Sequence, residues 1–240
     1  MPSPPHRAVG RLMLVAVLTA LAAALGFASD GQSSGSSGPD PQRFEADIAA
    51  FEAEDRRTPP PAGSVLFVGS SSIRYWDLDK AFPGRRLLKR GFGGSHVSDN
   101  VHFADRIIVR YRPALIVFYA GDADVAGGKN AEQIAADYRA LISVIHARLP
   151  AARTIVIGTK PSPAHWAHND TIRAANARVR TLAAADTLVD YVDVEAALLG
   201  PDRRPRPDFY AANGLNLNER GYAAWNDAVT RSIVRHWPKP

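Results

Sequence analysis

The chain has 240 residues, 46% of them hydrophobic, which is enough to bury one sizeable core within one domain. The formal net charge of +5 is mild, and the basic residues are scattered rather than interleaved with aromatic side chains, which argues against a nucleic-acid partner. The absence of cysteine excludes disulfides, thiolate nucleophiles and cysteine-ligated metal sites.

The amino terminus has the three parts of a bacterial-type secretory signal in the expected order. Basic residues between positions 6 and 11 precede an apolar run at 12–25, and small residues follow up to Ala28. We therefore predict a signal peptide over 1–28 that is cleaved after about Ala28, and a secreted or periplasmic protein. An uncleaved membrane anchor is the alternative, although the run is shorter than the roughly 20 residues that a spanning helix requires.

Residues 29–42 (SDGQSSGSSGPDPQ) contain no core-forming side chains and are predicted to be a flexible linker. No cysteine follows the apolar run, so a lipoprotein anchor is excluded. The folded domain is therefore expected to occupy residues 43–240.

Apolar runs and helical patterns alternate along this domain. Short apolar runs predict five strands, at 64–68, 86–89, 114–119, 154–158 and 188–192. Amphipathic spacing predicts helices at 44–56, from a cap at Ser95 or Ser98 to about 110, and at 131–149, 170–185 and 219–237. This order indicates an α/β fold, with a five-stranded parallel sheet in a three-layer α/β/α sandwich. No P-loop or G-x-G-x-x-G follows a strand at the required spacing, so we expect neither a nucleotide nor any other cofactor.

The strand at 64–68 leads directly into Gly69-Ser70-Ser71-Ser72, followed by Ile-Arg-Tyr-Trp. Open α/β sheets place ligands and nucleophiles in small-residue turns at the carboxyl ends of their strands. A serine-rich turn alone is weak evidence for chemistry, and the other segments of the chain decide its meaning.

Four segments together resemble the SGNH (GDSL-type) hydrolase family, a likeness that covers about residues 63 to 237. They are F-V-G-S-S-S-I-R-Y-W, R-G-F-G-G-S, Y-A-G-D-A-D and N-G-L-N-L-N with a following G-Y. The resemblance implies the SGNH, flavodoxin-like fold, places the nucleophile at Ser71 and assigns the backbone N–H of Gly94 to the oxyanion hole. Ser70 stands where many members have aspartate.

The same register shows three replacements. Ala123 stands where the family has the oxyanion asparagine, Asn213 replaces the aspartate that orients the base, and Asn216 replaces the histidine base. A carboxamide has no useful basicity, and alanine donates no hydrogen bond. Loss of one oxyanion donor costs about 10²–10³ in rate. The residues therefore predict impaired or silent chemistry.

Another group could replace the missing base. His96, His102, His165 and His168 all follow predicted strands at the catalytic edge, and a displaced base would make the chain an active serine esterase. His165 and His168 also have a spacing that suits a metal, but without nearby carboxylates we expect no metal site. Our leading expectation is a secreted, catalytically impaired family member that keeps a pocket for a small ester or an acylated carbohydrate.

Overall fold

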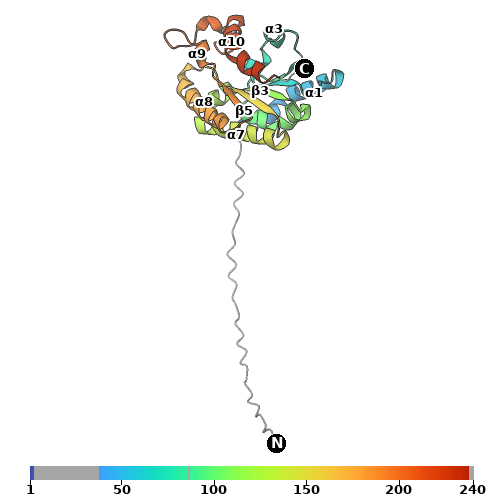
Figure 1. Cartoon of the computed structure of the whole chain (residues 1–240). Coiled ribbons are helices and arrows are strands. Elements are labelled where there is room, and N and C mark those ends of the chain that lie inside the picture. The colour runs from blue at the N-terminus through green and yellow to red at the C-terminus, as the bar shows by residue number, and fades with distance from the viewer. Residues whose placement is uncertain (3–37, 86, 238–240) are drawn as a thin grey trace. The chain divides into compact units, whose positions relative to one another are not determined.

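A computed structural model describes residues 1–2, 38–85 and 87–237 of the chain (Figure 1). Most of the predicted signal peptide and of the predicted linker lies outside these residues. Pro41 and Gln42, the last two residues of the predicted linker, belong to the 3-10 helix η1 (Pro41–Phe44), which leads directly into helix α1 (Glu45–Arg57). In the part of the chain that is described, no helix combines the length and apolar character needed to cross a bilayer.

The sheet is parallel and has five strands in the order β2-β1-β3-β4-β5. Their bounds are β1 (Val65–Gly69), β2 (Leu87–Gly91), β3 (Leu115–Tyr119), β4 (Arg153–Ile157) and β5 (Val189–Val192). The sequence predicted all five, within one or two residues at each end. The largest shift is in β2, which was predicted at 86–89. Its ladder with β1 continues to Val68↔Arg90 and Gly69↔Gly91, so backbone pairing extends the strand beyond its apolar residues.

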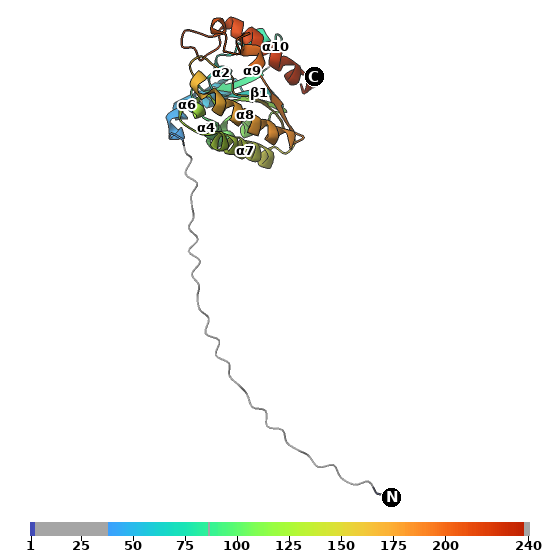
Figure 2. The ribbon, with the colours of Figure 1, turned by 90° about the vertical axis from the view of Figure 1, so that its left-hand side faces the viewer.

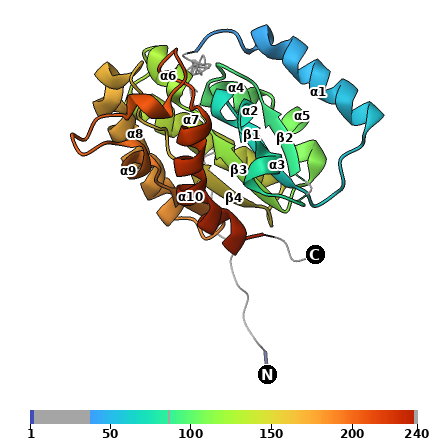
Figure 3. The ribbon, with the colours of Figure 1, turned by 90° about the horizontal axis from the view of Figure 1, so that it is seen from above.

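Helices cover both faces of the sheet, in the three layers that the sequence predicts (Figure 2). The core on one face is built with α1 and four further helices: α4 (Val97–His102), α5 (Ala104–Ile107), α7 (Ala131–Arg148) and α8 (Asn169–Ala184). The other core includes residues of α2 (Ser71–Arg74), α3 (Leu78–Ala81), α9 (Glu195–Leu198) and α10 (Glu219–Arg235). Figure 3 shows α10 crossing its face of the sheet, and α1 lying on the side of the edge strand β2.

Short elements complete the chain. They are α6 (Asp122–Ala126) and the 3-10 helices η2 (Val109–Tyr111), η3 (Trp166–His168) and η4 (Pro207–Phe209). The alternation of side chains along the strands explains the two cores. In β1, Leu66 and Val68 enter one core, and Val65 and Phe67 enter the other. Successive residues of a strand point to opposite faces, so a fully apolar strand of this kind must be covered on both sides.

One predicted helix is wrong in its start and its length. The expected helix from Ser95 or Ser98 to about 110 is divided into α4, α5 and η2, with Phe103 between the first two. The N-cap residue of α4 is His96 rather than either serine. The N–H groups at this end are bound by carboxylates: Asp99 accepts the N–H of His96 at 2.8 Å, and Asp124 accepts the N–H of Val97 at 3.0 Å. Phe103 is buried against the Phe92 ring, and it leaves helical geometry at that position.

Candidate active site

The turn after β1 presents one of its three serines to solvent. Ser70 and Ser72 are buried, whereas Ser71, the first residue of α2, is half-exposed. Gly69 makes this turn possible: its φ is +135°, and a Cβ there would lie 1.9 Å from the carbonyl oxygen of Tyr119. That same oxygen accepts the N–H of Ser70 at 2.8 Å. Of the three, Ser71 is therefore the hydroxyl that a ligand can reach.

The turn after β2 runs beside Ser71. The N–H of Phe92 donates to the Gly69 carbonyl at 2.9 Å, and a Cβ added at Gly93 would lie 3.8 Å from that of Ser71. Gly94 follows with a φ of +80° and is exposed, so glycine is favoured there by backbone conformation rather than by crowding. Gly94, the predicted oxyanion donor, therefore directly follows Gly93, the residue that lies beside Ser71.

Ala123 is the second residue of α6, directly after β3, and is partly exposed. The carboxyl ends of β1, β2 and β3 meet at one edge of the parallel sheet, so Ser71, Gly94 and Ala123 follow three neighbouring strands at that edge. The methyl group of Ala123 supplies no hydrogen-bond donor.

Asn213 and Asn216 lie in the loop before α10. The Asn213 side-chain oxygen accepts the N–H groups of Leu215 and Asn216, both at 3.0 Å, so this side chain stabilises its own turn. Asn216 is half-buried, and its Oδ1 is buried without a hydrogen-bond partner among the described residues. The site position predicted for a base therefore holds a neutral amide.

Three hydrogen bonds join this loop and the residues on either side of it to the same edge of the sheet. The Tyr210 hydroxyl donates to the Pro161 carbonyl at 2.6 Å, and the Ala164 N–H donates to the Gly214 carbonyl at 3.1 Å, both in the segment after β4. The Tyr222 hydroxyl of α10 donates to the Ser72 carbonyl at 2.8 Å. The four predicted segments therefore lie together at the carboxyl end of the sheet.

A buried ion pair lies next to Ala123, and sequence reasoning assigned it no role. The side chain of Lys160 is fully buried and donates to both carboxylate oxygens of Asp122, at 2.9 and 3.0 Å. The Tyr119 hydroxyl also donates to Asp122, at 2.6 Å. Burial, followed by the Asp122 charge, holds the pKa of Tyr119 well above its usual range, so this phenol stays protonated. The group ties the ends of β3 and β4 to the start of α6.

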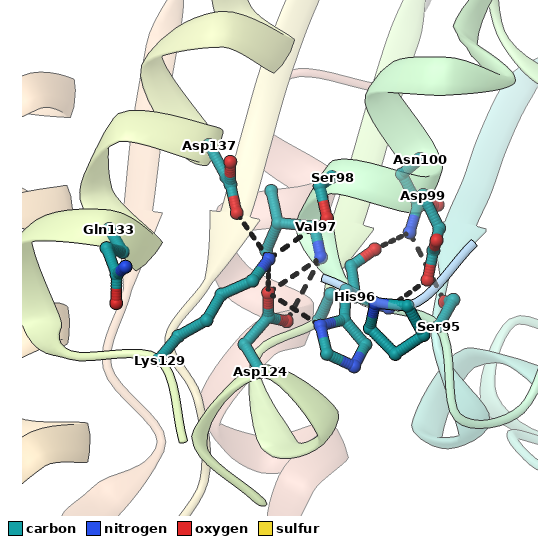
Figure 4. A network of polar contacts seen from close by, with 12 residues as sticks. Ser95, His96, Val97, Ser98, Asp99, Asn100, Asp124, Lys129, Gln133 and Asp137 are labelled. Carbon is teal, nitrogen blue, oxygen red and sulfur yellow. Dashed lines mark hydrogen bonds and ion pairs between the residues drawn. The ribbon is translucent and has the colours of Figure 1, made fainter. Parts of the chain in front are cut away.

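A second buried cluster joins the turn after β2 to α6 (Figure 4). The Lys129 ammonium contacts Asp124 at 2.8 Å and Asp137 at 2.6 Å, and the Asp124 carboxylate also accepts the N–H of Val97. Burial alone would lower the pKa of Lys129, but the two carboxylates outweigh it and the pKa is raised. His96 lies against this cluster, with Nδ1 3.6 Å from Asp124. Burial, followed by the Lys129 charge, lowers the pKa of His96.

The four candidate replacement bases differ in their surroundings. His96 is buried against the Asp124 cluster, while His102 and His168 are exposed. His165 is half-buried, and its Nδ1 is buried with no partner within the described part of the chain. Burial lowers the pKa of His165. Across residues 38–85 and 87–237, no three metal-ligating side chains are grouped so as to hold an ion.

Comparisons with known proteins agree with this arrangement. The chain is 26% identical over 192 residues to platelet-activating factor acetylhydrolase IB subunit alpha1 of Bos taurus, covering 77% of this chain and 69% of that protein. Its fold is similar to a GDSL-like lipase from Bacteroides thetaiotaomicron (TM-score 0.68, 19% identity, 80% of this chain and 99% of that one).

The fold is also similar to an acetylxylan esterase from Geobacillus stearothermophilus (TM-score 0.59, 16% identity, 72% of this chain and 94% of that one). A sequence profile matches residues 70–224, which begin at the serine turn and end within α10. The chain belongs to the GDSL-like lipase/acylhydrolase family.

Proposed function

We propose that this protein binds a small acyl ester or an acetylated carbohydrate beside Ser71, and that its hydrolytic chemistry is impaired by orders of magnitude. The observation that carries the proposal is the environment of Asn216. A serine hydroxyl is a poor nucleophile until a neighbour takes its proton, and a carboxamide cannot take it. Asn213 has no charge to stabilise a cationic base, and its oxygen is occupied by two backbone N–H groups.

The retained parts support ligand binding. Ser71 is accessible, and the turn at Gly93 and Gly94 runs beside it with the backbone conformation that only glycine adopts readily. The acetylxylan esterase and the bovine acetylhydrolase act, by their names, on acetyl esters, so an acetylated ligand is the class that we propose here.

An ester-hydrolysis assay tests the proposal. We expect kcat/KM of the purified protein on p-nitrophenyl acetate to lie close to that of Ser71→Ala, because position 216 holds asparagine, which cannot act as a base, in both chains. Acetylated xylo-oligosaccharide should nevertheless bind, as measured by calorimetry. A turnover that is high and is abolished by Ser71→Ala would reject the impaired-member reading.

A second function is favoured by one observation. His165 lies in the segment that contacts the Asn213–Asn216 loop, and its buried Nδ1 has no hydrogen-bond partner among the described residues. If His165 activates Ser71, the protein is an active esterase, and a fluorophosphonate probe should label Ser71 rapidly and His165→Gln should abolish the labelling. If the impaired-member proposal holds, labelling is slow in both chains.

Export is part of the same proposal. The arrangement of basic, apolar and small residues over 1–28 supports cleavage by a signal peptidase and action outside the cytoplasm, where acylated envelope or environmental glycans are found.

A further inference from the structure

A groove of about 620 Å³ opens between the segment after α2 and the first turns of α10. Its volume lies within the roughly 300–1,000 Å³ typical of small-molecule sites. Trp76 is buried at its base, with its ring stacked on that of Tyr222 at a centroid distance of 6.4 Å. Tyr75 also lines the groove and is 56% exposed. Among the residues that the structure describes, the only other large exposed hydrophobic side chains are Met1 and Val234.

Each charged side chain that lines the groove already has a partner within the described part of the chain. Lys80 forms an ion pair with Glu219 across it. The Asp77 carboxylate accepts the N–H of Lys80 at 3.0 Å and caps α3. A charged ligand would have to compete with these contacts, and a neutral ligand would not.

The uncharged lining indicates the chemistry of that neutral ligand. Of the described residues that line the groove, only Leu217 and Ala223 are aliphatic, so it offers little aliphatic surface to a long acyl chain. Aromatic rings and polar side chains make up the remainder. The Asn226 side-chain oxygen accepts the Trp76 indole N–H at 2.8 Å, which leaves its amide hydrogens to donate. Aromatic rings beside hydrogen-bonding groups match a polyhydroxylated ligand, which has apolar C–H faces and hydroxyl edges.

The groove begins one helical turn from Ser71. The Tyr75 N–H donates to the Ser71 carbonyl at 2.9 Å, and helical residues four apart have Cβ atoms about 5–6 Å apart. The Tyr222 hydroxyl, on the opposite wall, donates to the Ser72 carbonyl. We propose that this groove is a subsite for a neutral oligosaccharide, with Tyr75 as its stacking platform. That the acetyl group of the same ligand enters the Ser71 pocket rests on the proposed function, whereas sugar binding in the groove does not.

Calorimetric titration of the full chain with xylotetraose, and with its acetylated form, tests this subsite. Tyr75→Ala should weaken xylotetraose binding about tenfold because it removes the stacking surface. Tyr75→Phe should retain most of the affinity, since it keeps the ring. Val234→Ala, which removes another exposed hydrophobic side chain far along α10, should bind like the unchanged protein. Circular dichroism of each variant checks that it is folded.

The outcomes separate the two proposals. Xylotetraose that does not bind, or that binds Tyr75→Ala and the unchanged protein equally, overturns the subsite. Tighter binding of 1-octanol, a neutral probe for an acyl chain, than of xylotetraose, with octanol binding lost in Tyr75→Ala, also overturns it in favour of an acyl-chain groove. Xylotetraose that binds through Tyr75 with no added affinity for the acetylated form supports the subsite and contradicts the acetyl pocket beside Ser71.

Discussion

Restoring the proton relay at Ser71 is the most direct test of the impaired site. The change is Asn216→His and Asn213→Asp together with Ala123→Asn. The side-chain oxygen of Asn213 already accepts the N–H groups of Leu215 and Asn216 at 3.0 Å. An aspartate at 213 keeps both bonds with the same oxygen. Its second oxygen is then free to accept an imidazole N–H from position 216, which holds the tautomer that a base requires.

The expected gain follows from the two kinds of group that are added. A positioned general base contributes about 10²–10⁴ in rate, and one oxyanion donor contributes about 10²–10³. Because the groups act on one transition state, their effects are strongly non-additive. We therefore expect each single change to gain little, and the triple variant to gain on the order of 10³-fold or more in kcat/KM.

Hydrolysis of p-nitrophenyl acetate measures this gain, and circular dichroism establishes that the variants are folded. Adding Ser71→Ala to the triple variant is the matched control, and it should return the rate to that of the starting protein. A folded triple variant with no gain would show that the loop at 213–216 does not face Ser71 as the register requires. A starting protein already as fast as the triple variant would refute the impaired-member proposal itself.

Three further outcomes are expected from the chain. Lys160→Met should lower the free energy of unfolding in urea by about 3–5 kcal/mol because it leaves an unpaired buried charge on Asp122. Adding Asp122→Asn should recover part of that loss. An unchanged urea midpoint in Lys160→Met would contradict this prediction. The pKa of His96 is lower in the folded chain than in the unfolded chain, so the unfolded chain takes up more protons as the pH decreases from about 7 towards 5.5. Stability should therefore fall over this range, and His96→Gln should flatten that dependence in thermal melts. Mass spectrometry of the protein from its native host should find an amino terminus near Ser29, whereas an intact Met1 in a membrane fraction would contradict cleavage.

Much of the fold could be predicted because the strands and long helices have clear sequence patterns. The apolar runs that became β1 and β3 are buried along their whole length, and α7 has its apolar residues on one face. The break at Phe103 could not be predicted, since it depends on packing against the Phe92 ring, which follows β2. The start of α4 depends on the carboxylate of Asp124, which comes from α6. Short helices such as α6 have too few residues to show a period.

The candidate site, like the fold, could be predicted only in part from the sequence. The family register predicts site positions at Ser71 and Asn216, and the structure adds that Ser71 is the accessible serine of its turn. The buried pair of Lys160 with Asp122 had no signal in the sequence, because lysine is ordinarily an exposed residue. Lys160 is buried because the ends of β3 and β4 lie side by side, and the residue pattern within either strand does not predict this pairing.

The contacts between α10 and the serine turn affect the order in which the site is made. Tyr222 and Asn226 of α10 hold residues 72–76, which were synthesised about 150 positions earlier. Until the ribosome has released the last helix, Trp76 has neither its indole partner nor the ring that stacks on it. This edge of the sheet is therefore among the last parts of the protein to form, and a chain truncated before α10 would leave its central aromatic side chains exposed to aggregation.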